Sequence, residues 1–300
     1  MTLAGGTICI LLGISWGGNA FEWSDSRVIG TLIGGAATLV VFYFVEQKVR
    51  DPLIDASLFH NRTVLAITAA EFFYGANLIG LMYYVPQFFQ LVFGDSATLS
   101  GVGLLPMMLG LGVGNPIAAF ITSRYKVSLI NAQVGAIMQT LASGLMVRWD
   151  AGTTRVEAVI LLVILGIGQG AGMSGLLLTA QAAVKSSLVG IVTGLTIFVQ
   201  TVGDNFGIAF FAAVYINELR SSLGQLAISK ENVTNILADV TYIKHHFDKR
   251  TQQEIVKVYA VSMRNGWWLM FACALATLLL AALAKQHEFK DQESESEDAT

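Results

Sequence analysis

Residues 66–125 read AITAAEFFYGANLIGLMYYVPQFFQLVFGDSATLSGVGLLPMMLGLGVGNPIAAFITSRY, and this stretch decides the fold. It contains two apolar runs, Ala66–Phe93 and Leu99–Thr122, separated by Gly94-Asp95-Ser96. Neither run contains Lys or Arg, and Glu71 is their only carboxylate. As a helix, each run could cross a hydrocarbon core about 30 Å thick. Because a soluble core helix seldom stays apolar on every face, the stretch predicts a membrane hairpin.

The composition of the whole chain favours the same class. Hydrophobic residues make up 54% of the sequence and charged residues 13%, which is well below the charged share of a soluble domain. The net charge of −3 offers no basic face for nucleic acid. The two cysteines, Cys9 and Cys273, both lie in apolar runs, so we expect small buried side chains and no disulfide framework.

Six further apolar runs bring the number of candidate spans to eight, and we predict an all-α integral membrane protein with about eight transmembrane helices. The first run starts directly after Met1 with no basic residue before it, which favours a clipped membrane helix over a signal peptide. A polar stretch over 217–266 predicts a long loop, and the acidic end of the chain predicts a disordered tail. The six runs are Thr2–Gly18, Val28–Val45, Val127–Val147, Val156–Ala183, Val189–Ile216 and Trp267–Ala284.

The orientation follows from the basic residues of the short loops. With both termini in the cytoplasm, eight basic residues lie in inner loops and three in outer loops, as the positive-inside rule favours. The sequon at Asn232 then lies in the long outer loop and predicts a glycosylation site, whereas the sequon at Asn61 lies inside and should stay bare.

A glycine pattern at 170–175 matches the dinucleotide-binding signature GxGxxG. That signature requires a preceding strand and a following acidic residue, but here it lies within a long apolar helix. We therefore interpret the glycines as a surface for close helix packing.

Asp204 is the first candidate for chemistry. Thr193, Thr196, Gln200 and Asp204 form one polar stripe on the predicted helix 189–216, with Phe198, Val202 and Phe206 on the opposite face. A polar stripe inside a membrane must face a partner or a wet cavity. Asp204 is thus either a proton-coupling or cation-binding acid, or an acid hydrogen-bonded into a helix contact.

Glu71 is the second acid, followed along its helix by Tyr74 and Asn77. It could contact a cationic substrate, or lie near the inner boundary and reach water. Gln90, Gln169 and Gln181 are interpreted as cavity or helix-contact amides, and Trp267 and Trp268 as anchors at the membrane boundary. The candidate residues of a substrate or proton pathway are therefore Asp204, Glu71, Gln200, Asn77, Tyr74 and Gln90; no catalytic or metal-binding residues are predicted.

Several motifs carry a resemblance. Tyr83-Tyr84-Val85-Pro86 with Phe89-Gln90, and Ser100-Gly101-Val102 with Leu104-Leu105-Pro106, resemble the fourteen-helix drug:proton antiporters of the major facilitator superfamily in their fungal form. Trp16-Gly17-Gly18 with Trp23-Ser24, and Phe198-Val199-Gln200 with Gly203 and Gly207, agree with it. The resemblance covers nearly all of this chain but only the back half of the family, because the motifs of the first half are absent.

This resemblance implies an organisation. It implies two linker helices over 1–50, a cytoplasmic loop over 51–62, a C-terminal six-helix bundle over 63–284 that includes the outer loop 217–266, and a cytoplasmic tail over 285–300.

The resemblance also implies proton-coupled efflux of drugs or other small molecules from the plasma or vacuolar membrane. The implied partners are lipid, protons, a small-molecule substrate that is cationic or drug-like, and a separate N-terminal half; no cofactor is implied. Asp204 departs from the family, which has a small residue there. The alternative is a non-transporting or partner-binding membrane fragment. An enzyme is not favoured, since no nucleophile–base pair or phosphate-binding loop was found.

Overall fold

The computed structural model describes residues 2–17, 21, 24–46, 57–224, 232, 236 and 242–287. Within these residues, eight helices have fifteen residues or more, and the prediction of an all-helical membrane fold is confirmed. They are α1 (Thr2–Trp16), α2 (Ser26–Glu46), α4 (Arg62–Val92), α6 (Leu105–Tyr125), α7 (Ser128–Met146), α8 (Arg155–Ala182), α9 (Val189–Leu223) and α12 (Lys249–Leu283). Short helices are α3 (Ser57–His60), α5 (Ala97–Val102), α11 (Tyr242–His246) and the 3-10 turn η1 (Ser186–Leu188).

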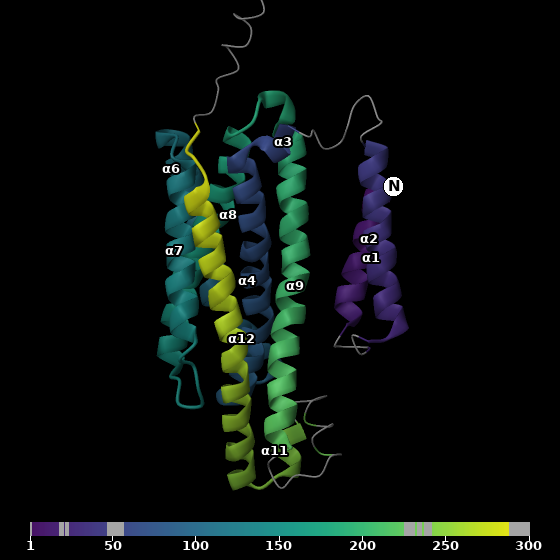
Figure 1. The fold of residues 1–300 in the computed structure, drawn as a ribbon. Coiled ribbons are helices and arrows are strands. Elements are labelled where there is room, and N and C mark those ends of the chain that lie inside the picture. Colours follow the sequence, from purple (N-terminus) through teal and green to yellow (C-terminus); the bar gives the residue numbers. More distant parts are fainter. Residues whose placement is uncertain are drawn as a thin grey trace, which may run out of the picture.

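Six of the long helices form an up-and-down bundle, and the α1–α2 hairpin stands beside it against α9 (Figure 1). Helix α8 packs between α6 and α7, while α4 packs against both α9 and α12. Five described segments are long and apolar enough to cross a membrane: Arg62–Val92, Ala97–Tyr125, Arg155–Ala182, Ser186–Leu223 and Lys249–Leu283. Helix α7 is not among them, and it carries several buried polar residues that face the bundle.

The predicted hinge of the first hairpin is confirmed. Helix α4 ends at Val92, Gly94 adopts a left-handed φ of 68°, and the Ser96 side chain accepts a hydrogen bond from the backbone N–H of Leu99. Glycine suits that φ because it has no Cβ to collide with the backbone. At the other end of α4, the Asn61 side chain caps the helix and donates to the carbonyl of Ala183 at 2.7 Å. Asn61 therefore ties the start of α4 to the end of α8.

The glycines at 170–175 pack helices, as predicted. A Cβ on Gly170 would lie 2.5 Å from the carbonyl oxygen of Leu111 on α6. A Cβ on Gly175 would collide with the backbone of Ala132 on α7. The row of glycines thus lets α8 approach two helices at backbone contact.

The predicted loop 217–266 is wrong in extent. Helix α9 continues to Leu223 and α12 already starts at Lys249, so both helices project beyond α7 at the predicted outer end (Figure 1). Asp248 caps α12, and the hydrogen bond from the Thr251 hydroxyl lowers the pKa of its carboxyl. The early turns of α12 are amphipathic and not uniformly apolar, which is why a search for apolar runs missed them.

We call the projecting part of α9 and α12, together with α11, the cap. Its apolar core is formed by Leu219, Leu223, Ile236, Ile243 and Ile255, which are all buried. The Tyr259 hydroxyl donates to the carbonyl of Ile236 at 2.9 Å. The described residues of the polar stretch 217–266 therefore form a packed helical element.

Trp267 is not a boundary anchor, contrary to the prediction. Its side chain is fully buried and lies edge-on to Trp149 and Phe88, with ring centroids 5.7 and 6.1 Å away. Trp268 is 54% exposed and still fits an anchor. The adjacent tryptophans point to opposite sides because successive helix positions are about 100° apart. The predicted loop at 51–56 and most of the predicted acidic tail, 288–300, lie outside the described residues.

Candidate functional site

The packing of α4 against α9 brings the two predicted acids together. Glu71 lies on α4 and is 3% exposed, while Asp204 lies on α9 and is half-buried. A Cβ on Gly75, one turn after Glu71, would lie 2.6 Å from Oδ1 of Asp204 and 2.5 Å from the carbonyl oxygen of Gln200. The Asp204 carboxylate therefore rests on the α4 backbone, one turn from Glu71.

Oxygen atoms without hydrogen-bond partners mark this junction. Three buried oxygen atoms lack a hydrogen-bond partner among the residues that the structure describes: Oε2 of Glu71, Oδ1 of Asp204 and the hydroxyl of Thr68, one turn before Glu71. Within the described residues, neither acid forms an ion pair with a basic side chain. Two adjacent carboxylates inside a membrane repel each other and lack solvent, so the junction is suited to hold a proton or another cation.

The polar stripe of α9 faces α4 in part. Gln200 is half-buried beside Gly75 of α4, and Thr196 is buried. Phe206, predicted on the opposite face, instead packs its ring 5.4 Å from the ring of Phe72 on α4. The contact face of α9 is therefore broader than the predicted stripe, because Gly203 and Gly207 bring the helix backbones together.

Tyr74 and Asn77 point into the bundle, toward α7, α8 and α12. The Tyr74 hydroxyl donates to the carbonyl of Gln169 at 2.8 Å. The Asn77 amide donates to the carbonyl of Met270 at 2.8 Å and to the Ser143 hydroxyl at 3.2 Å. All of these side chains are buried.

Two glutamine side chains complete this group. Nε2 of Gln139 donates to Oδ1 of Asn77 at 2.7 Å, and Nε2 of Gln169 donates to the same atom at 3.3 Å. We call Asn77, Gln139, Ser143 and Gln169 the amide cluster. It joins α4, α7 and α8 to the backbone of α12. Because the cluster is buried, each unpaired polar group in it would lower the stability of the fold by about 1–3 kcal/mol.

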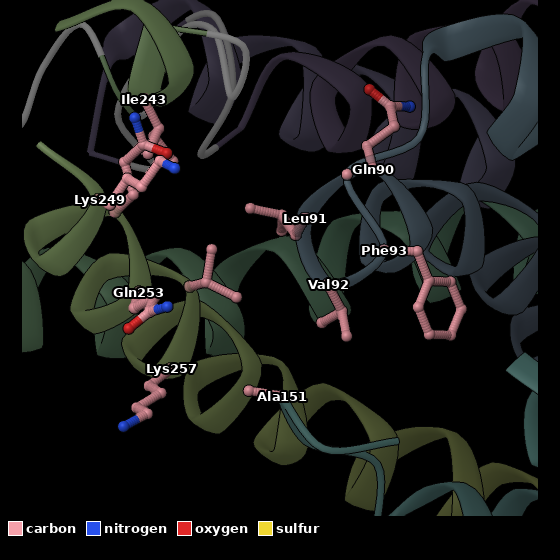
Figure 2. Close-up of a pocket in the computed structure, with 12 residues that line it drawn as sticks. Gln90, Leu91, Val92, Phe93, Ala151, Ile243, Lys249, Gln253 and Lys257 are labelled. Atoms are coloured by element: carbon pink, nitrogen blue, oxygen red, sulfur yellow. The ribbon is translucent and has the colours of Figure 1, made fainter. Parts of the chain in front are cut away.

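Gln90 lies apart from the other candidates, at the predicted outer end of α4. Its Nε2 donates to the Ser100 hydroxyl at 3.0 Å. It also lines a cavity of about 600 Å³ between the end of α4 and the cap (Figure 2). Lys249, Gln253 and Lys257 of α12 line the opposite wall. Since none of the five other candidates lines this cavity, it is separate from the carboxylate junction.

Sequence reasoning missed Gln139, Ser143 and the ion pair between Asp95 and Arg155. Arg155 donates two hydrogen bonds, of 2.7 and 3.0 Å, to the buried Asp95 carboxylate, and its guanidinium lies 4.6 Å from the Phe93 ring centroid. The pair joins the α4–α5 turn to the start of α8. The sequence signal for these four residues is weak: each is a polar residue that lies inside an apolar run or at its end.

Comparisons with known proteins agree with this architecture. The model of the family described as "Fungal trichothecene efflux pump (TRI12)" matches residues 1–237. Efflux pump dotC of Dothistroma septosporum is 29% identical over 288 residues, which cover 94% of this chain and 49% of that protein. The multidrug transporter protein MdtP of Bacillus subtilis is 30% identical over 215 residues, covering 71% of this chain and 39% of that protein. The chain thus spans about half, or less, of the length of these relatives.

Solved structures show the same fold. The inward-facing, occupied structure of a bacterial homolog to the human lysosomal transporter Spinster superposes with a TM-score of 0.58 at 15% sequence identity. The match covers 94% of this chain and 66% of that one. At this identity, the likeness concerns the arrangement of the helices.

Proposed function

The chain belongs to the fungal trichothecene efflux pump family, within the drug efflux branch of the major facilitator superfamily, and we propose that it forms the C-terminal half of a proton-coupled exporter of small molecules. One observation carries the proposal. Glu71 and Asp204 meet inside the membrane, and neither has a basic partner among the described residues.

The acids would act as the coupling site. A bound proton removes one of two repelling charges, so the junction can close away from water; release of the proton requires access to water again. In alternating access, the site opens to each side of the membrane in turn. Asp204 is the more exposed acid, so it would be the first to exchange protons with water, and Glu71 would stabilise the shared proton behind it.

A cationic or drug-like substrate fits the surroundings of this pair. A cation and a proton compete for the same negative charge, which couples substrate release to proton uptake. The rings of Phe72 and Phe206, half-buried beside the acids, offer flat faces to an organic cation. Gln200 supplies an amide at the same place.

Transport would need a second six-helix bundle, in the same polypeptide or as a separate N-terminal half. The substrate site of such transporters lies between two bundles, and the six helices α4, α6, α7, α8, α9 and α12 form one. The α1–α2 hairpin would be the pair of linker helices. We propose that both termini face the cytoplasm, that the cap lies outside, and that the protein resides in the plasma or vacuolar membrane.

Reconstitution in liposomes tests the proposal. With an imposed proton gradient and a fluorescent cationic dye, the chain together with an N-terminal half of a family member should move the dye, and the 300-residue chain alone should not. Asp204→Asn and Glu71→Gln should each abolish the movement, because they remove the titratable groups without a large change in volume. Asn205→Ala is the matched control, since the Asn205 amide bonds only to its own helix, at the carbonyl of Thr201.

Three outcomes would contradict the proposal. Dye movement unchanged in Asp204→Asn and in Glu71→Gln would leave both acids as structural groups. Gradient-dependent movement by the chain alone would show that one bundle suffices. No movement with the N-terminal half, despite a stable complex, would favour the alternative of a non-transporting membrane protein.

A further inference from the structure

The orientation of Asn77 is fixed by its partner on α12. Its Nδ2 donates to the backbone carbonyl of Met270 at 2.8 Å, and a carbonyl oxygen can only accept. The Oδ1 atom of Asn77 must therefore face the other way, toward α7 and α8. Reversing the amide would set two oxygens against each other.

The orientation of Asn77 in turn fixes both glutamines. Gln139 and Gln169 approach the same oxygen, so each must present its Nε2 to it. Their own carbonyl oxygens then point away from Asn77. Both atoms, Oε1 of Gln139 and Oε1 of Gln169, are buried and have no hydrogen-bond partner among the described residues, and both side chains are fully buried. No flip of either amide removes this deficit, because it would create a contact between acceptors.

The Ser143 hydroxyl is the third incomplete group. It accepts a hydrogen bond from Asn77, but it donates none among the described residues. Among the described residues, the amide cluster therefore leaves two acceptor oxygens unpaired, together with the Ser143 hydroxyl hydrogen and the second N–H of each glutamine amide. Buried polar groups in proteins are paired, with protein or with ordered water.

We propose that the amide cluster is an internal water-binding site, in which bound water donates to Gln139 and Gln169 and accepts from Ser143. A water molecule donates two hydrogen bonds and accepts others, so it can pair with the two unpaired oxygens and with leftover O–H and N–H donors. A metal ion is the competing ligand. The free groups are neutral, and three neutral oxygens cannot offset the loss of hydration of a cation inside a membrane.

This water is distinct from the coupling site. The cluster faces the inside of one bundle, between α4, α7, α8 and α12, whereas Glu71 and Asp204 meet at the contact of α4 with α9. The proposed water site is therefore independent of the proposed transport function, and each can be tested without the other. Its consequence is that the contacts of α4 with three neighbouring helices contain exchangeable water and are not a dry seam.

Radiolytic labelling tests the site. X-ray pulses produce hydroxyl radicals from bound water in place, and these modify the side chains next to it. In the purified full chain in lipid nanodiscs, Tyr74 and Met270, both 0% exposed, should be modified. Met107 and Phe211 are equally buried and serve as the matched methionine and aromatic controls; they should stay unmodified.

A double variant tests the ligands. Gln139→Leu with Gln169→Leu removes both free acceptors, so modification of Tyr74 and Met270 should fall to the level of the controls. Absence of modification at Tyr74 and Met270 in the folded wild-type chain overturns the proposal, whatever the variant does. Modification that is present in choline chloride but lost in sodium chloride also overturns it, because the site would then hold a metal ion.

Discussion

Replacing Asn77 with leucine should destabilise the bundle strongly. Asn77 takes part in four hydrogen bonds, of 2.7 to 3.3 Å, and the two shortest join it to Gln139 and to the backbone of Met270. Leucine accepts and donates none of them, and no bulk water reaches the abandoned partners because they are buried. At about 1–3 kcal/mol for each unpaired buried group, the two shortest bonds alone predict a loss of about 2–6 kcal/mol.

Thermal unfolding in detergent, followed by intrinsic tryptophan fluorescence, measures this loss. For domains of about 150–250 residues, 1 kcal/mol corresponds to about 2–4 °C in Tm, so Asn77→Leu should lower Tm by at least about 4 °C. Asn205→Ala is again the control, because it removes one amide hydrogen bond within a single helix at an exposed position. Its Tm should stay close to that of the wild type.

Equal Tm values for Asn77→Leu and Asn205→Ala would refute the reasoning. They would mean that the amide cluster does not hold the helices together, and that Asn77 is free to serve a transport pathway. A lower Tm with normal dye transport at reduced temperature would instead assign Asn77 to stability.

Three further predictions concern packing and topology. Gly207→Ala should destabilise the α4–α9 contact by about 1–3 kcal/mol, since the added methyl collides with the Ala76 carbonyl. The control is Gly194→Ala, whose added methyl meets no neighbour within 4 Å and should leave the stability unchanged; the Tm values of the two variants are compared by thermal unfolding. Trp267→Ala should lower stability by about 3–5 kcal/mol and Trp268→Ala far less, because only the first side chain is buried. In a glycosylating host, glycosidase should shift the mobility of the wild type but not of Asn232→Gln; a shift that persists in the variant contradicts an outer cap.

The fold could be predicted from the sequence wherever hydropathy alone decides it. The surface that a helix presents to lipid must be apolar, so the apolar runs marked the helices, and Gly94 marked the hinge. The same criterion failed at Lys249–Gly266, because the start of α12 belongs to the cap and is amphipathic. The start of α12 depends on the N-terminal capping residue Asp248 and on the burial of Ile255 and Tyr259, which a search for membrane spans does not consider.

The candidate site could be predicted only in part. An acid in an apolar run stands out in a sequence, so Glu71 and Asp204 were found one at a time. Their meeting depends on the close approach of α4 and α9 at Gly75, which is a property of the packed bundle. Gln139 and Ser143 of the amide cluster were missed for a similar reason, and Asn77 and Gln169 were found without their partners. Asn77 meets Gln139 and Gln169 across 62 and 92 residues of sequence, and glutamine in a helix carries no signal of its partner.

The cap should also amplify small tilts of the two helices that form it. Helices α9 and α12 run unbroken from the membrane into it, so any tilt of either helix moves the cap further than it moves the membrane part (Figure 1). Helix α9 carries Asp204, and α12 holds Asn77 through Met270. A spectroscopic label on the exposed Lys249 or Arg250 would therefore convert small rearrangements at the acids or the amides into a measurable displacement.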